Sequence, residues 1–216
     1  MFKQSILCAL LLASTGAFAS PVGLNFSSVN TAVSTDVSVN GNKLRTSIGS
    51  YNLNAEGTNL VGFCVDPFQW ASRAVTTYDK SSLDATDFFA GNGAIRFANA
   101  QKLFDNAYAT LSGATQTAGF HLALWEIFHD DLSTTSGVIK GSDTSNTGML
   151  TAANGYLSAL NGWNTTNAYD LTFYGSGQYQ DFLVANPSAV PVPAALPLFA
   201  SGLIGFGAMY RRRTKI

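Results

Sequence analysis

The run LVGFCV, at residues 60–65, is followed at once by Asp66 and Pro67. A short apolar run that ends in turn-forming residues is typical of a strand buried on both faces. Further along the chain, the stretch GFHLALWEIF, at residues 119–128, places apolar side chains on one face at the helical period. The two stretches therefore predict a buried strand and a helix of about residues 117–128.

The sequence on either side predicts further strands and helices. Apolar and polar residues alternate over residues 33–48, interrupted by Asn40-Gly41, a pair that favours a two-residue hairpin turn. A second turn is expected at Glu56-Gly57. Strands that are followed by helices and then by a last strand are typical of an α+β domain. The remaining predicted elements are helices at 97–111 and 148–160 and a strand at 171–174.

The composition excludes several classes of protein. The chain has 216 residues, of which 12% are charged, and a formal net charge of −1. This balance argues against a charge-rich disordered chain, a coiled coil and a protein that binds nucleic acid through a basic patch. Residues 20–189 hold seven basic and thirteen acidic residues, a net charge of −6. We therefore expect an acidic, soluble domain with no nucleic-acid partner.

The N-terminus has the layout of a secretory signal peptide over residues 1–19. A basic start precedes an apolar run at residues 6–13, and Ala17 and Ala19 are the small residues that signal peptidase requires. The run is too short to span a bilayer, which takes about 17–25 residues in a helix. We expect cleavage before Ser20 and export of the remaining chain through the inner membrane.

The C-terminus has the layout of a membrane helix. Residues 194–210 carry no charge and are followed at once by the arginine cluster at 211–213. An uncharged span that ends in basic residues predicts a single transmembrane helix whose tail stays in the cytoplasm. Because this span is close to the lower length limit for crossing a bilayer, we expect a weak, transient anchor.

Together with the prolines before it, this end resembles the PEP-CTERM sorting signal of Gram-negative bacteria. That signal combines a short proline motif, a brief hydrophobic helix and an arginine cluster, here over residues 190–216. Valine stands where many members have glutamate, as in the Val-Pro-Leu-Pro-Ala-Ala variants. The resemblance implies that an exosortase removes the helix and releases or attaches the rest of the chain. The residues that carry it are Val190, Pro191, Val192, Pro193, Ala194, Ala195, Arg211, Arg212 and Arg213.

Cys64 is the only cysteine left once the signal peptide is removed. A single cysteine cannot form a disulfide within an exported chain, so its thiol needs another explanation. One explanation is packing, because cysteine is among the most buried residue types and behaves as a small apolar group. The sequence around it offers a second explanation.

A strand with GFCVDP and a helix with HLALWEI resemble those of bacterial surface thioester domains, and the likeness extends loosely over residues 22–174. It implies a β-rich, sandwich-like N-terminal part with a helical subdomain, in an ectodomain at 20–175. Residues 176–189 lack periodicity and predict a linker. In thioester domains, a strand cysteine is bonded to a glutamine that lies four residues before a helical tryptophan. The matching positions here are Cys64, Asp66, His121, Trp125 and Glu126.

His121 stands at the position of the bond-forming glutamine. An imidazole has no acyl carbon for a sulfur to attack, so Cys64 cannot form the thioester with His121. The pair could instead act as a thiolate and an imidazolium in a cysteine nucleophile. The plainer alternative is a helix histidine that packs beside Trp125, one turn along. The other glutamines considered as bonding partners, none at the required spacing, are Gln69, Gln101 and Gln116.

We expect neither a metal nor a cofactor. His129, Asp130 and Asp131 fall where the helix is expected to end, and together with His121 they complete no familiar zinc spacing. Tryptophans can line a carbohydrate groove or belong to the core. The three in this chain are Trp70, Trp125 and Trp163.

These inferences combine into one functional hypothesis. We expect an exported, exosortase-sorted protein of the cell surface or extracellular matrix, which passes through a transient membrane-anchored state. Its ectodomain would be a structural or adhesive module, with extracellular polysaccharide or surface proteins as partners. The alternatives are a covalent thioester adhesin and an enzyme that uses Cys64 as nucleophile and His121 as base.

Overall fold

The computed structural model describes residues 20–82, 92–129, 131–141 and 146–189. The expected signal peptide at residues 1–19 and the expected sorting signal at residues 190–216, with its membrane helix at 194–210, lie outside the described residues. Within the described ranges, no helix is both long enough and apolar enough to cross a membrane.

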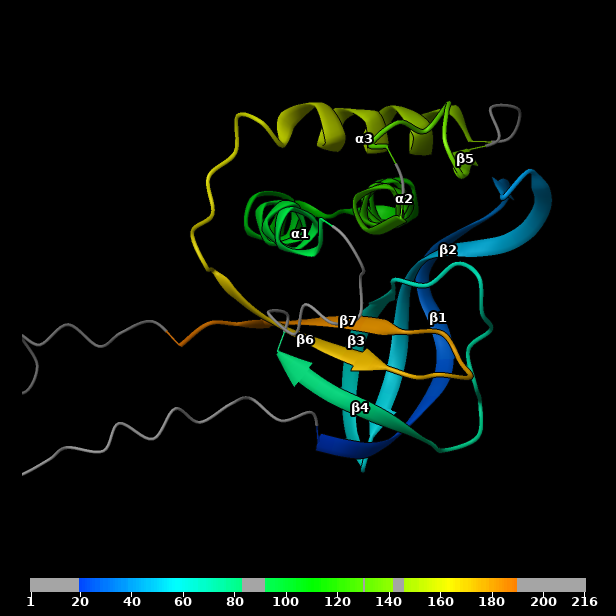
Figure 1. The fold of residues 1–216 in the computed structure, drawn as a ribbon, viewed down its shortest axis with the longest axis vertical. Helices are drawn as coiled ribbons and strands as arrows, with labels where there is room; N and C mark the ends of the chain where they lie inside the picture. The colour runs from blue at the N-terminus through cyan, green and yellow to red at the C-terminus, as the bar shows by residue number, and fades with distance from the viewer. Residues whose placement is uncertain (1–19, 83–91, 130, 142–145, 190–216) are drawn as a thin grey trace, which may run out of the picture.

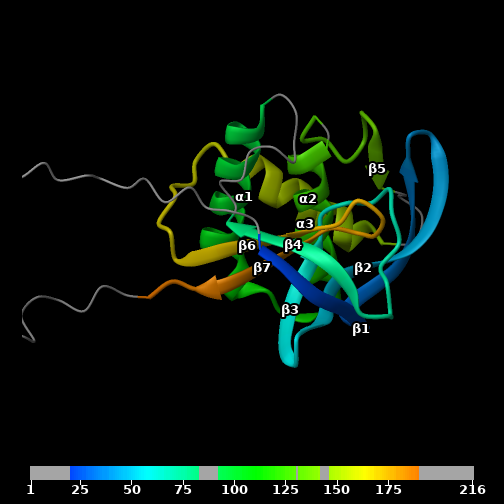
Figure 2. The same cartoon turned by 60° about the horizontal axis from the view of Figure 1, so that its bottom comes forward.

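Within the described residues, seven strands form one sheet in the order β2-β3-β7-β6-β4-β1-β5, and every pairing is antiparallel. β1 also pairs with β2, so the strands other than β5 form a closed ring (Figure 2). The length of β1 allows this closure: Leu24 pairs with Ala55 of β2 on one side and with Thr76 of β4 on the other. The strands are β1 (Ser20–Val39), β2 (Asn42–Ala55), β3 (Thr58–Cys64), β4 (Thr76–Ser82), β5 (Ile139–Gly141), β6 (Tyr169–Gly175) and β7 (Phe182–Pro187).

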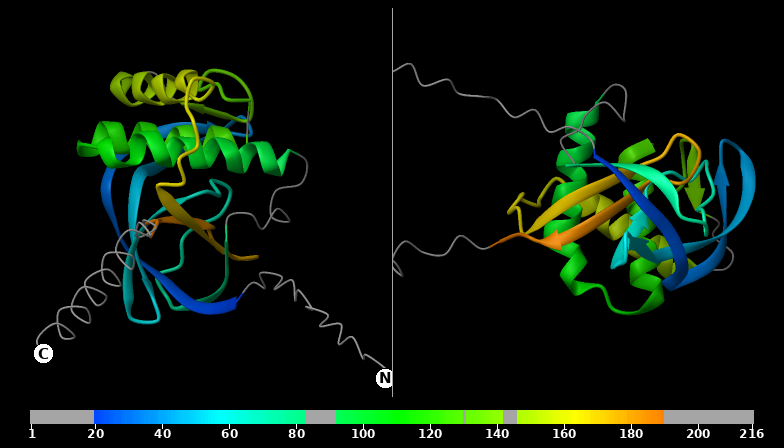
Figure 3. Two further views of the ribbon diagram at one scale, coloured as in Figure 1. Left: turned by 90° about the vertical axis from the view of Figure 1, so that its left-hand side faces the viewer. Right: turned by 90° about the horizontal axis from the view of Figure 1, so that it is seen from below.

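The three α-helices in the described part of the chain lie together on one side of the strands (Figures 1 and 3). α2 is the central helix: it contacts α1, α3, β1 and β2, and every residue from Thr117 to Phe128 is buried. A helix that is apolar and buried all round belongs to the interior of a domain. The helices are α1 (Gly93–Ala107), α2 (Gly113–His129) and α3 (Thr147–Ala159).

Both turns that the sequence predicts are present. Asn40 and Gly41 have φ angles of 53° and 77°, and they join β1 to β2. Glu56 and Gly57 have φ angles of 49° and 88°, and they join β2 to β3. Positive φ at both central residues is the conformation of the turn that matches the twist of a hairpin. These turns fix the register of β1, β2 and β3 relative to one another.

The predicted combination of a strand-rich part and a helical subdomain is confirmed, and two details differ. The strands belong to one sheet that closes on itself, where the resemblance implied a sandwich. The linker predicted at 176–189 is wrong in part, because β7 pairs with β3 on one side and with β6 on the other. Only Phe182, Leu183 and Val184 of β7 are buried. So short a run shows no period in the sequence, and pairing with two neighbours makes it a strand.

Gly119 marks a close approach of α2 to α3. A Cβ atom at this position would lie 2.6 Å from the Cβ of Ala152 and 2.9 Å from the carbonyl oxygen of Met149. We expect Gly119→Ala to lower the free energy of unfolding by about 1–3 kcal/mol, because overpacking a tight contact costs that much. Denaturant unfolding of the parent and the variant measures the difference.

Gly155→Ala is the matched control, because it adds the same methyl group to the exposed side of α3, where nothing lies within 4 Å. Alanine is favoured over glycine inside a helix by about 1 kcal/mol. This variant should therefore be at least as stable as the parent. Equal losses of stability in the two variants would contradict a tight contact at Gly119.

Candidate functional site

The carbonyl oxygen of Cys64, at the end of β3, contacts two side chains of α2. The imidazole Nε2 of His121 lies 2.7 Å from this oxygen, and the indole Nε1 of Trp125 donates a hydrogen bond to it at 2.9 Å. The two residues are four apart, so their rings lie one turn apart on the same helix face, with centroids separated by 4.7 Å. The structure thus brings together Cys64, His121 and Trp125, which the sequence analysis singled out.

His121 also contacts β2. Its Nδ1 accepts a hydrogen bond from the backbone N–H of Gly49 at 2.9 Å. Since Nδ1 accepts, the ring proton resides on Nε2, which donates to the Cys64 carbonyl oxygen. Complete burial lowers the pKa of His121 to about 4, although its two backbone hydrogen bonds act in the opposite direction. The imidazole is therefore neutral at pH 7, and it joins α2 to two strands.

Gly49 is a position without room for a side chain. A Cβ atom there would lie 2.1 Å from the carbonyl oxygen of Thr31 and 2.5 Å from the Cα of Ala32. The register of β1 against β2 shifts between Val29 and Ala32, and such irregularities let one backbone approach another closely where glycine is present. The irregularity in β1 and the glycine in β2 together place a backbone donor against His121.

The thiol of Cys64 does not contact the imidazole nitrogens. Its Sγ donates a hydrogen bond to the carbonyl oxygen of Asp66 at 3.2 Å, and the residue is completely buried. This burial raises the pKa of the Cys64 thiol well above its usual value. A cysteine nucleophile needs the opposite arrangement, an accessible thiolate stabilised by a cationic imidazole. Cys64 and His121 are in contact, but the imidazole contacts the backbone carbonyl oxygen of Cys64 and not its thiol. The burial of the thiol favours its neutral form.

Two carboxyl groups lie near the turn that follows β3. Asp66 accepts a hydrogen bond from the backbone N–H of Phe68 at 2.8 Å, which stabilises this turn. Asp181 immediately precedes β7, and its carboxylate accepts a hydrogen bond from the N–H of Ser176 at 2.6 Å. Burial, with a smaller contribution from the charge of Asp66, raises the pKa of Asp181 to about 7.

Glu126 and His129 hold the segments around α2. Glu126 is buried, and its carboxylate accepts a hydrogen bond from the N–H of Ser133 at 3.2 Å. A ring nitrogen of His129 contacts the carbonyl oxygen of Val65, while the ring packs edge-on against Phe68 at 5.2 Å. Asp130 lies outside the described residues. Among the residues that are described, no three His, Cys, Asp or Glu side chains gather closely enough to bind a metal ion.

Two of the glutamines considered as bonding partners have other contacts. The side-chain amide of Gln101 donates to the carboxylate of Asp105 at 2.9 Å, and the side-chain oxygen of Gln116 accepts from Ser112 at 2.8 Å. Gln69 lies on the segment after β3, beside a surface groove. None of these three glutamines takes the place of His121 beside Cys64.

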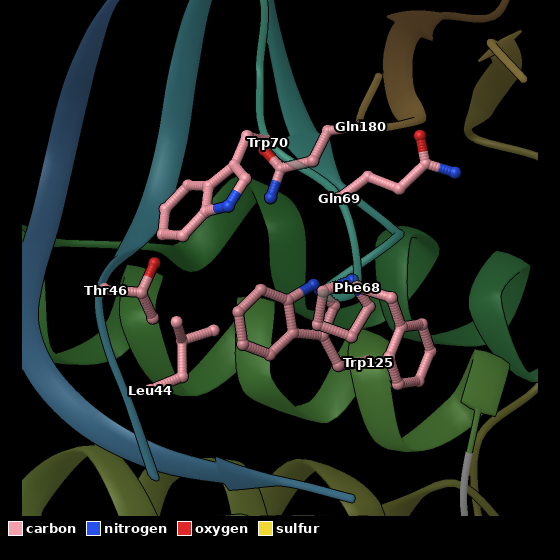
Figure 4. Close-up of a pocket in the computed structure, with 8 residues that line it drawn as sticks. Leu44, Thr46, Phe68, Gln69, Trp70, Trp125 and Gln180 are labelled. Atoms are coloured by element: carbon pink, nitrogen blue, oxygen red, sulfur yellow. The ribbon is translucent and has the colours of Figure 1, made fainter. Parts of the chain in front are cut away.

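The groove lies between β2 and the segment after β3 (Figure 4). It consists of two adjoining hollows of about 80 Å³ and about 300 Å³, which share Thr46, Trp70 and Gln180. The tryptophans differ: Trp125 is buried beneath the smaller hollow, whereas Trp70 is 68% exposed. Sequence analysis alone did not indicate that Thr46 and Gln180 belong to one site, because they are far apart in the chain and match no motif. Trp163 packs elsewhere, against Tyr156.

Comparisons with known proteins relate this chain to others by fold alone. No protein family and no curated protein matched the sequence. Among solved structures, the chain is similar to the N-terminal domain of the Streptococcus pyogenes pilus tip adhesin Cpa. The TM-score is 0.50 and the sequence identity 14%, over 82% of this chain and 97% of that one. At this sequence identity, the likeness shows a shared fold.

The two groups with shifted pKa values predict opposite dependences of stability on pH. The pKa of His121 falls from 6.5 to about 4 on folding, so acidification from pH 6.5 to pH 4 destabilises the fold through this group. The pKa of Asp181 rises from 3.8 to about 7 on folding, so the same acidification stabilises the fold through this group. In the parent protein the two contributions offset each other.

Single variants should separate the two contributions. Asp181→Asn keeps only the contribution of His121. The free energy of unfolding of this variant should therefore fall by about 2–3 kcal/mol when the pH is lowered from 6.5 to 4. His121→Asn leaves the contribution of Asp181, so the free energy of unfolding of this variant should rise over the same interval. Denaturant titrations at closely spaced pH values measure both slopes. Parallel slopes in the two variants would overturn the assignment.

Proposed function

We propose that this chain is an exported surface or extracellular-matrix protein whose ectodomain is a structural or adhesive module that binds without a covalent bond. The contact between His121 and Cys64 carries the proposal. Where thioester domains join strand and helix by a bond, this chain has a side chain that can form only hydrogen bonds. The fold likeness to a pilus tip adhesin domain supports an adhesive role.

The surroundings of the thiol support a role that is not enzymatic. Cys64 is buried, and its raised pKa keeps it protonated at neutral pH. A covalent adhesin or a cysteine enzyme would need this sulfur to be accessible to a partner or substrate. Those two functions are therefore the alternatives that a test must exclude.

The proposal includes the route to the surface. Signal peptidase would cut before Ser20, and an exosortase would recognise the motif at residues 190–195. The helix at 194–210 would hold the chain in the inner membrane only until that cleavage. The partners would then be extracellular polysaccharide or other surface proteins, with no nucleic acid among them.

The mass and the reactivity of the exported protein test the non-covalent role. A thioester would lower the mass by about 17 Da, through loss of one ammonia, and would leave no thiol. We expect the full mass calculated from the sequence and one thiol that iodoacetamide modifies only after unfolding, because Cys64 is buried. A mass deficit, or rapid alkylation of the folded protein, would favour one of the alternatives.

Cys64→Ala supplies the functional control for that measurement. Cells that export this variant should adhere to surfaces and to one another as cells with the parent protein do, because the proposed binding uses no sulfur. Circular dichroism shows whether the variant is folded. Loss of adhesion by a folded Cys64→Ala variant would point to a covalent or catalytic thiol.

The sorting route has its own test in a host that carries an exosortase. We expect the mature protein to lack Arg211, Arg212 and Arg213 and to leave the inner membrane, as shown by mass spectrometry of the fractionated cells. Deletion of the exosortase should retain the full C-terminus in the membrane fraction. A mature protein that keeps the arginines and remains membrane-integral in the intact host would refute this route.

A further inference from the structure

We propose that the groove beside Trp125 binds a neutral glycan, with one sugar ring stacked on the exposed indole of Trp70. This inference rests on the proposed function, since it names the class of ligand and the site of the adhesive module. It is carried by four observations on the groove: its exposed aromatic rings, the fixed backbone beneath them, the polar groups that face them, and the charge of the lining.

The exposed aromatic rings lie on the segment between β3 and β4. Trp70 is 68% exposed and Phe68 is 47% exposed, and both line the smaller hollow. Large aromatic side chains that remain exposed together beside a hollow indicate a binding surface. An indole is suited to a ligand with one apolar and one polar face, because it combines a broad apolar face with one polar edge.

The backbone that carries these rings is held by the segment before β7. The N–H of Val65 donates to the carbonyl oxygen of Asp181 at 2.9 Å, and the N–H of Gln180 donates to the carbonyl oxygen of Trp70 at 3.2 Å. The turn at Asp66 adds a third hydrogen bond. The platform is therefore ordered before any ligand arrives, which lowers the entropic cost of binding.

Polar side chains face the rings. In Figure 4 the amide of Gln180 extends towards the space between Trp70 and Trp125, and Thr46 of β2 lies across from Trp70. Ser47 lines the larger hollow. Amides and hydroxyls both donate and accept hydrogen bonds, so they can pair with the hydroxyls at the edge of a sugar ring whose face lies on the indole.

The charge of the lining selects a neutral ligand. Arg45 is the one charged side chain among the described residues that line the two hollows, and it pairs with Asp36 at 3.6 Å. Tyr51 also lines the larger hollow, and burial raises its pKa further above neutral, so it stays uncharged. A polyanion would require a row of unpaired cationic groups. The two hollows are together large enough for a short saccharide, since small-ligand sites begin at about 300 Å³.

Affinity electrophoresis of the purified exported protein tests the inference. Native gels are cast with dextran, galactomannan or laminarin as neutral probes and with alginate as an acidic comparison. We expect retardation by at least one neutral polysaccharide and none by alginate. Failure of all three neutral probes to retard the parent protein, or retardation by alginate alone, would overturn the inference.

Trp70→Ala should weaken the binding constant of the retarding polysaccharide about tenfold or more, as truncation of a central aromatic contact commonly does. Trp70→Phe, which keeps an aromatic face, should retain part of the affinity. The matched control is Trp163→Ala, which removes a tryptophan that packs against Tyr156 outside the groove. Equal affinities of the Trp70→Ala and Trp163→Ala variants, both folded by circular dichroism, would place the binding elsewhere.

The same variants separate this inference from the proposed function. If Trp70→Ala abolishes adhesion of cells and binding of the neutral polysaccharide, both ideas are supported. If Trp70→Ala abolishes polysaccharide binding while the variant cells adhere normally, the groove binds glycan, but the proposed adhesive role belongs to another surface. If neither binding nor adhesion changes, the glycan inference fails and the adhesive module stands. If an extended peptide binds the parent protein but not Trp70→Ala, and no polysaccharide binds either, the glycan inference also fails and the groove is a peptide site.

Discussion

Two hydrogen bonds to one carbonyl oxygen position the central helix on the sheet. β3 pairs with β2 only as far as Gly62, so at Cys64 the backbone must find partners outside that ladder. The ring N–H groups of His121 and Trp125 supply them. Because His121 also accepts from Gly49, one helical turn joins α2 to both β2 and β3. The helix cannot shift along the sheet without breaking these contacts.

The same contacts explain why this imidazole is a poor partner for the thiol. Nδ1 is occupied by the Gly49 N–H, and Nε2 gives its proton to the carbonyl oxygen. Complete burial disfavours the charged imidazolium, which accounts for the lowered pKa of His121. The thiol meanwhile bonds to the Asp66 carbonyl oxygen. Burial at this contact thus keeps both the imidazole and the thiol neutral.

Much of this fold could be predicted, because its turns and its central helix leave local signals. Asn40-Gly41 and the apolar spacing of α2 indicated the hairpin and the helix correctly. β7 could not be predicted, since only three of its residues are buried and one of its two partners, β3, lies far away in the chain. The site was predicted at the level of residues, because Cys64, His121 and Trp125 match a known spacing. The contact of the His121 and Trp125 rings with the Cys64 carbonyl oxygen could not be predicted, since every residue has a backbone carbonyl group and the sequence does not show which one is bonded.

Trp125 connects the structural contact to the groove. Its indole N–H is committed to the Cys64 carbonyl oxygen, so only the edge and face of the ring remain to form the base of the smaller hollow. Trp70 lies across this hollow with most of its surface exposed, on a segment fixed by the loop before β7. Two tryptophans that look equivalent in the sequence therefore have different tasks. The buried one makes the site rigid, and a rigid site loses less entropy when the exposed one receives a ligand.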